Sequence, residues 1–223
     1  MNEVSPGERR KQLQTARRFL IALFLFITQA FGTTYYVSSS SGSDSNNGTS
    51  ASSPWKTVTK VNGHAYAAGD SILFKRGDTW AGSPNFSKTL KTTSAGVSGK
   101  QITYGSYGSG AAPILDGKGS ISTAFQISRN YITIDSFQIQ NVAGTLIDFT
   151  GVSETVIRNI VGKNPGTWGY RAGSGAGNTT IDHTSCSVDS GHAIRGWCYQ
   201  GVGQGSMKIT NSSCDLSKTN SGA

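Results

Sequence analysis

The feature that most constrains the fold is a short segment that the chain repeats. Its four copies each begin with an isoleucine: "IDSFQIQN" at Ile134, "IRNIVGKN" at Ile157, "IDHTSCSV" at Ile181 and "ITNSSCDL" at Ile209. Successive copies begin 23, 24 and 28 residues apart. Self-similarity at such a period is typical of solenoids, because one unit of this length cannot bury its own apolar face. The copies are therefore expected to stack.

The third residue of each copy is short or polar: Ser136, Asn159, His183 and Asn211. Asn and similar residues tolerate left-handed backbone, so this position predicts a tight bend with a short strand on either side. A second alignment precedes the bend, on Gly144, Gly166 and Gly191, and supplies a further strand. Each repeat then holds three short strands separated by turns.

Composition agrees with an all-β solenoid. The chain has 223 residues, 29 of them glycine, and only 14% of its residues are charged. Ser, Thr and Asn dominate the polar remainder, which is typical of strands and turns rather than helices. The length suits one domain with a sizeable core.

Three cysteines lie late in the chain. Cys186 and Cys214 occupy the same place in two copies, which predicts neighbouring coils and one inward column, with Cys198 apart from them. An odd number of cysteines allows at most one disulfide and one free thiol.

The first residues predict export. A polar, basic stretch over 1–18 runs into the mainly apolar, 14-residue segment Phe19–Gly32, which is typical of a secretory signal and short for a stable membrane anchor. Without 1–32 the formal charge falls from +8 to +5. This excess fits an anionic partner, whereas the absence of a basic run or basic helix disfavours nucleic acid.

Two further blocks carry a family resemblance. "YYVSSSSGSDSNNGTSASSPWKTVTKVNGHAYAAGDSILFKRGDTWAG" at Tyr35–Gly82 and "GKQITYGSYGSGAAPILDG" at Gly99–Gly117 precede the repeats. Together with the repeats they resemble exported right-handed parallel β-helix proteins of the pectate-lyase-like type. The resemblance implies a signal peptide over 1–32, an N-terminal cap with a short helix and the first coil over 33–98, and coils over 99–223 that continue beyond the chain.

The resemblance also places a saccharide groove on the outer face of the first strand of each coil. In the glycine alignment, Asp148 faces outward with Trp168 and Tyr170 of the next copy, and these are the expected substrate-binding residues. Arg195 follows in the same column, and Arg195 with Lys163 or His192 is the expected catalytic set. Aromatic rings stack on sugars, and a guanidinium pairs with a uronate carboxylate.

Three functions remain open at this point. The first is an exported polysaccharide lyase that cleaves an acidic polysaccharide by β-elimination. The second is a glycoside hydrolase on the same fold, which needs two carboxylates flanking the bond. The third is a non-catalytic glycan-binding or adhesin-like protein. Each is expected to be secreted or at the cell surface and to be a monomer at full length. No cofactor is certain, and Ca²⁺ is possible.

Overall fold

A computed structural model describes residues 5–14, 32–189, 198–201 and 205–217. The chain divides into two compact units, residues 1–31 and 32–223. In the first unit, residues 6–14 are helical. Within the described ranges, no helix combines the length and the apolar character needed to cross a membrane.

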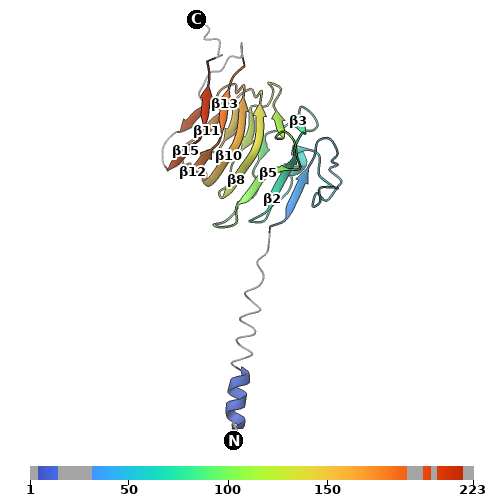
Figure 1. Cartoon of the computed structure of the whole chain (residues 1–223), viewed down its shortest axis with the longest axis vertical. Helices are drawn as coiled ribbons and strands as arrows, with labels where there is room; N and C mark the ends of the chain where they lie inside the picture. The colour runs from blue at the N-terminus through green and yellow to red at the C-terminus, as the bar shows by residue number, and fades with distance from the viewer. Residues whose placement is uncertain (1–4, 15–31, 190–197, 202–204, 218–223) are drawn as a thin grey trace. The chain divides into compact units, whose positions relative to one another are not determined.

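The second unit consists of parallel strands and one short helix (Figure 1). Its elements, in chain order, are β1 (Thr34–Val37), α2 (Val58–Asn62), β2 (Ser71–Lys75), β3 (Thr79–Ala81), β4 (Leu90–Lys91), β5 (Ile102–Tyr107), β6 (Ile114–Asp116), β7 (Thr123–Gln126), β8 (Ile132–Gln140), β9 (Thr145–Asp148), β10 (Ser153–Lys163), β11 (Tyr170–Ala172), β12 (Gly177–Asp182), β13 (Ser185–Ser187), β14 (Tyr199–Gly201), β15 (Met207–Thr210) and β16 (Ser213–Asp215).

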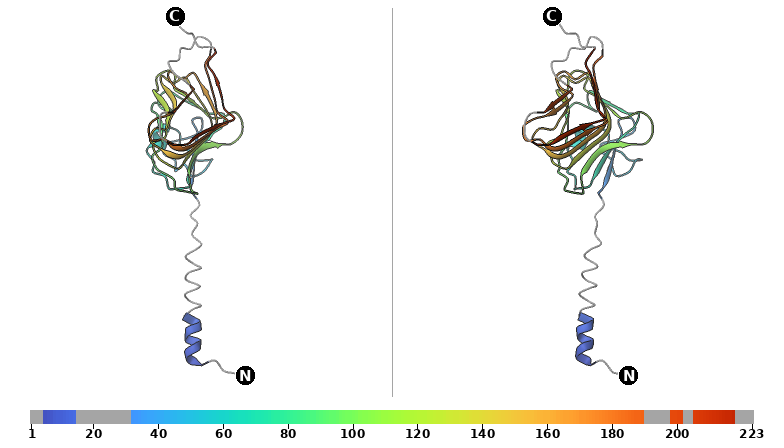
Figure 2. Two further views of the ribbon diagram at one scale, coloured as in Figure 1. Left: turned by 90° about the vertical axis from the view of Figure 1, so that its left-hand side faces the viewer. Right: turned by 60° about the vertical axis from the view of Figure 1, so that its left-hand side comes forward.

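These strands form two parallel sheets. The large sheet has eleven strands and follows the order β1-β2-β5-β8-β10-β12-β15, with β3, β6, β13 and β16 beside this path. The small sheet has five strands in the order β14-β11-β9-β7-β4. Neighbours in each sheet come from successive coils, so the chain forms the predicted parallel β-helix. The two views in Figure 2 show the sheets as walls around a shared interior.

The isoleucines that open the four copies lie in one inward column. Ile134 pairs with Ile157, Ile157 with Ile181, and Ile181 with Ile209. The first three side chains are fully buried, whereas Ile209 on the last described coil is 40% exposed. Burying the same apolar column coil after coil fixes the register of the large sheet.

The bend residues adopt the predicted backbone. Ser136, Asn159, His183 and Asn211 have φ values of 64°, 55°, 48° and 48°. In the later coils the bend separates two strands, β12 from β13 and β15 from β16, whereas β8 and β10 run through it as single strands. Each coil thus has three strand segments, as predicted.

The first coil has its own cap. Helix α2 follows Pro54 and Trp55, as predicted, and its N-cap Thr57 accepts a hydrogen bond from the backbone N–H of Lys60 at 3.1 Å. The backbone N–H of Tyr36 donates to the carbonyl of Gly48 at 2.7 Å, and that of Trp55 donates to the carbonyl of Tyr36 at 2.8 Å. The loop between β1 and α2 therefore covers the outer edge of β1, which would otherwise present unpaired backbone groups.

The cysteines agree with the prediction in part. Cys186 and Cys214 are paired in register on β13 and β16, so their predicted stacking is confirmed. The prediction that Cys198 lies apart is wrong, because Cys198 and Cys214 form a disulfide with a Cα–Cα distance of 5.8 Å. Cys186 is free and buried. Cys198 is therefore buried beside Cys186 rather than apart from it.

Candidate functional site

The outer face of the small sheet carries one continuous row of polar side chains, which we call the polar column. The strand pairing places one of its residues on each of the five strands: Lys91, Gln126, Asp148, Arg171 and Gln200. On the other face, each strand turns a large apolar or aromatic residue inward, and these are Leu90, Phe125, Ile147, Tyr170 and Tyr199. Alternation along each strand therefore separates a core column from the polar column.

An ion pair occupies the centre of the polar column. The guanidinium of Arg171 donates to the Asp148 carboxylate at 2.9 Å, and the Asp148 side chain is 13% exposed while that of Arg171 is 41% exposed. The backbone N–H of Thr150 donates to the other Asp148 oxygen at 3.0 Å. These two hydrogen bonds hold the Asp148 carboxylate in place. Through this carboxylate, the Arg171 guanidinium is linked to the preceding coil.

An aromatic ring supports the same guanidinium. Arg171 lies over the Trp168 ring, with the guanidinium carbon 5.1 Å from the ring centroid. Such cation–π contact contributes about 0.5–1 kcal/mol at exposed sites. Trp168 is half-buried. The site combines a fixed positive charge, a carboxylate and an indole, which are groups that can bind an acidic sugar by charge, hydrogen bonding and stacking.

The structure corrects the predicted outward face at one position. The Tyr170 side chain is 1% exposed and stacks on Tyr199 in the core, so it is not on the surface as predicted. Arg171 takes the place beside Asp148 that the sequence alignment gave to Tyr170. The glycine alignment was displaced by one residue from the true register, and a one-residue slip moves every side chain of a strand to the other face.

The predicted catalytic residues are not brought together among the described residues. Arg195 and His192 lie outside the described ranges, and the residue opposite Tyr170 in the next coil is Tyr199 rather than Arg195. Lys163 ends β10, where it pairs with Gln140 of β8 and with β13 in the large sheet. It therefore lies on a different sheet from Asp148 of β9.

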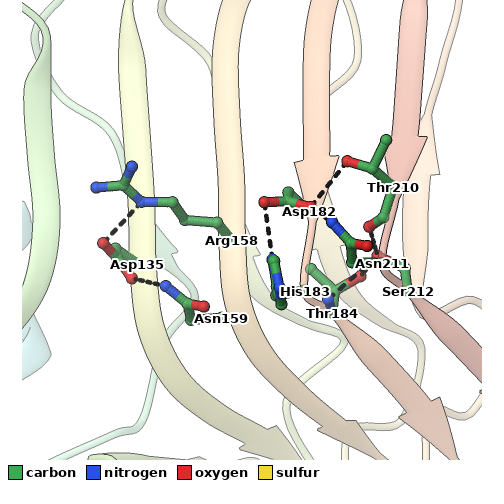
Figure 3. Close-up of polar contacts among 9 residues, drawn as sticks. All are labelled: Asp135, Arg158, Asn159, Asp182, His183, Thr184, Thr210, Asn211 and Ser212. Carbon is green, nitrogen blue, oxygen red and sulfur yellow. Dashed lines mark hydrogen bonds and ion pairs between the residues drawn. The ribbon is translucent and has the colours of Figure 1, made fainter.

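A second polar surface follows the bend of the large sheet (Figure 3). Its first part is centred on Asp135, which accepts hydrogen bonds from Arg158 and Asn159 of the next coil, both at 2.8 Å. Burial favours the neutral acid, but these donors and the Ser136 hydroxyl outweigh it and lower the pKa of Asp135. The side chain is thus a carboxylate that joins two coils.

The second part of this surface is centred on Asp182. Its Oδ1 accepts hydrogen bonds from Asn211 at 2.9 Å and from Thr210 at 2.8 Å, and its Oδ2 lies 2.8 Å from Nδ1 of His183. These contacts, led by the Asn211 amide, hold the pKa of Asp182 well below its ordinary value. Both carboxylates along the bend are therefore ionised at neutral pH.

Metal ligands are not clustered in the described part of the chain. Within those ranges there is no group of three or more His, Cys, Asp or Glu side chains that could hold a metal ion. The Ca²⁺ that the sequence left possible is therefore not assigned to any set of residues here.

No family model matches the chain. A lacto-N-biosidase from Bifidobacterium longum subsp. longum is 32% identical over 136 residues, a match that covers 51% of this chain and 8% of that protein. The chain thus spans a small part of this curated relative.

Solved structures share the architecture at lower identity. A GH136 lacto-N-biosidase from Eubacterium ramulus is 18% identical, with a TM-score of 0.62 over 80% of this chain and 40% of that one. Pectate lyase Pel9A is 18% identical, with a TM-score of 0.65 over 83% of this chain and 48% of that one. An alginate lyase from a Paenibacillus species gives a TM-score of 0.51 at 16% identity, over 71% of this chain and 64% of that one. The chain therefore has the right-handed parallel β-helix fold seen in a pectate lyase and in a lacto-N-biosidase.

Proposed function

We propose that this protein acts on carbohydrate and that it binds an acidic polysaccharide along the polar column. The observation that carries the proposal is the Arg171 guanidinium, held 2.9 Å from Asp148 and 5.1 Å from the Trp168 ring centroid. A guanidinium fixed in this way still has N–H groups free of the Asp148 contact, and these suit the planar carboxylate of a uronic acid. The Trp168 ring offers an adjacent apolar face to the sugar ring.

The reaction that we propose is β-elimination. A lyase removes the proton beside the uronate carboxylate, and this step requires a positive group to neutralise the carboxylate together with a base. Arg171 supplies the positive group in the proposal. In the proposal the base is Arg195 or His192, which precede β14 in the sequence, while Lys163 of the large sheet is not part of the polar column. The likeness of the fold to a pectate lyase and an alginate lyase supports this choice.

Glycoside hydrolysis is the second candidate, and the 32% identical lacto-N-biosidase favours it. An inverting hydrolase places two carboxyl groups about 6.5–9.5 Å apart, and a retaining one about 5–5.5 Å apart. Asp148 is the one carboxylate of the five residues in the polar column. A hydrolase would therefore need its second carboxylate from outside this column.

The cellular setting is part of the proposal. The basic and then apolar start of the sequence supports export to the cell surface or the medium, where a polymeric substrate is found. We propose a monomer without a stable membrane anchor and without a nucleic-acid partner. The short apolar stretch and the moderate, dispersed positive charge support these assignments.

Two measurements separate the functions. The protein is incubated with polygalacturonate, alginate and a neutral glucan, and both ultraviolet absorbance and new reducing ends are followed. Absorbance from unsaturated products on an acidic polymer supports the lyase, whereas reducing ends without absorbance identify a hydrolase. Binding without either product identifies a glycan-binding protein.

The binding surface is tested with a matched pair of variants. Arg171→Ala should weaken binding to the acidic polymer by roughly tenfold or more, because a charge-assisted hydrogen bond contributes about 1.5–3 kcal/mol. Arg158→Ala is the control, since Arg158 has the same kind of partner, Asp135 at 2.8 Å in the preceding coil, but lies on the large sheet. Equal binding by both variants would remove the polar column as the saccharide site.

A further inference from the structure

The three cysteines meet in the last described coils, where Cys186 and Cys198 are buried and Cys214 is exposed. Cys186 and Cys214 are direct partners on the neighbouring parallel strands β13 and β16. Cys198 reaches the same point from the start of β14, and its sulfur, bonded to Cys214, lies 3.5 Å from the carbonyl oxygen of Cys186. The free, buried thiol of Cys186 therefore lies next to the Cys198–Cys214 disulfide, and its strand β13 is paired with β16, the strand of Cys214.

The spacing of the paired strands β13 and β16 is compatible with a second disulfide. Neighbouring strands lie about 4.8 Å apart, and disulfides usually join Cα atoms about 4.4–6.8 Å apart. A bond between Cys186 and Cys214 would thus need rotation of side chains and no shift of β13 against β16. Gly169 lets the Cys186 sulfur approach the backbone of the small-sheet side closely, because a Cβ there would lie 2.7 Å from that sulfur and 2.6 Å from the Cys198 carbonyl oxygen.

We infer that Cys186 is the attacking group of an internal disulfide exchange, in which the Cys198–Cys214 bond is replaced by a Cys186–Cys214 bond. The Cys186 thiolate attacks the Cys214 sulfur, the bond to Cys198 breaks, and Cys198 leaves as a thiolate that takes up the proton lost by Cys186. One disulfide and one thiol are present before and after, so the exchange needs neither an oxidant nor a reductant.

The surroundings of Cys186 decide when the exchange occurs. Burial raises the pKa of the Cys186 thiol to about 12, and the thiol rather than the thiolate is present at neutral pH. The titratable groups that face it are the phenols of Tyr170 and Tyr199, whose pKa values burial also raises, so they bring no charge at neutral pH. The Cys198–Cys214 form is the resting form, and exchange requires alkaline pH or local opening of the last coil.

The exchange has a structural consequence. The Cys198–Cys214 bond joins the residue that precedes β14 of the small sheet to β16 of the large sheet. A Cys186–Cys214 bond would instead join two coils of the large sheet and release the small sheet from this link. The switch therefore controls how firmly β14, the strand that carries Gln200 of the polar column, is held.

Cysteine variants of the full chain test the inference without any saccharide. In Cys198→Ser, oxidation in a glutathione buffer should join Cys186 to Cys214, with loss of both remaining thiols in a thiol count made in denaturant. In the matched Cys186→Ser variant, the Cys198–Cys214 bond should form and stay unchanged in alkaline buffer. A Cys198→Ser protein that keeps both thiols reduced would overturn the inference.

The wild-type protein provides a measurement that does not depend on how the variants fold. It is held at neutral or alkaline pH, quenched in acid, alkylated and mapped by peptide mass spectrometry. The alkylated residue should change from Cys186 at neutral pH to Cys198 after alkaline incubation, with a linked Cys186–Cys214 peptide. Alkylation of Cys186 alone at both pH values, or a Cys186–Cys214 bond already at neutral pH, would contradict the exchange.

Discussion

At the scale of single residues, left-handed backbone marks the corners of each coil. Asn159 and its partners of the bend are one set, Asn141 and Asn164 form another, and a third set consists of Tyr131, Glu154 and Asn178. All have φ between 42° and 64°. Left-handed backbone costs an ordinary L-residue about 1–2 kcal/mol, and Asn tolerates it better than most. The first two sets of corners thus explain why Asn and other polar residues recur at fixed places in the repeat, whereas the third set also contains Tyr131 and Glu154.

Substitutions at Asn159 can separate the contributions of backbone conformation and of hydrogen bonding to the free energy of unfolding. Asn159→Ala should lower the free energy of unfolding by about 1–3 kcal/mol, because it loses both the tolerance for φ of 55° and the bond to Asp135. Asn159→Gly loses the bond alone and should be less destabilised. Urea unfolding followed by circular dichroism measures both, and equal losses would show that the bend is not strained.

The bend residues were also the most predictable part of the chain. A left-handed corner restricts residue type strongly, so Ser136, Asn159, His183 and Asn211 could be recognised from the sequence and their backbone is confirmed. The pairing of Cys198 was not predictable in this way. It depends on where the chain returns after β13, and nothing in the repeat fixes the length of that return.

At the scale of strands, the inward isoleucine column packs one coil against the next. Ile157→Ala should destabilise the protein by about 2–5 kcal/mol, because its side chain is fully buried between Ile134 and Ile181. Ile209→Ala is the matched control from the same column, and its 40% exposure should reduce the loss to less than half of that. Similar losses at the two positions, measured by chemical unfolding, would contradict the stacked column.

Carboxylates link the strands of successive coils and make stability depend on acid. Burial of Asp116 favours the neutral acid, but hydrogen bonds led by the Gln140 amide outweigh it and lower its pKa, and donors likewise lower the pKa of Asp44, Asp78 and Asp135. A carboxylate whose pKa is lower in the folded state than its unfolded value of about 3.9 stabilises the fold when the pH is above that unfolded value. This stabilisation is lost as the pH falls through the folded-state pKa.

The urea midpoint should therefore change little between about pH 7 and pH 5 and fall below about pH 4. Asp116→Asn should lower the midpoint at neutral pH and make it less sensitive to acid, because one of the depressed carboxylates is removed. A midpoint that stays constant in the wild type down to about pH 3 would show that these carboxylates do not stabilise the fold.

Strand positions were predicted better than strand faces. The isoleucine register was correct because a buried column tolerates no slip. The alignment of the small-sheet strands was based on Gly144 and Gly166, which lie before their strands. The second coil has one further residue between its glycine and the paired positions, so the alignment placed Tyr170 opposite Asp148 where the structure has Arg171. Arg171 could have been found by applying the 23-residue spacing of the isoleucines to Asp148.

At the scale of the whole molecule, stability in a stacked-coil protein depends on contacts between neighbouring coils. The first and last described coils differ, because the loop before α2 covers β1 whereas Met207 and Ile209 of β15 are 37% and 40% exposed. Amide exchange measured by mass spectrometry should be slow in β8 and β10, slow in β1 and fast in β15 and β16. Equal protection of β1 and β15 would show that the loop does not act as a cap.

The bend and the strand pairs keep a fixed register, while the length of a coil changes from 23 to 28 residues. The additional residues fall outside the paired segments, so residues can be inserted or deleted in the connecting loops without moving any side chain of the columns. The surface beside the polar column can thus diversify through loop length while the sheets stay constant. Such a scaffold can evolve new specificity by insertion, with little need to rebuild its core.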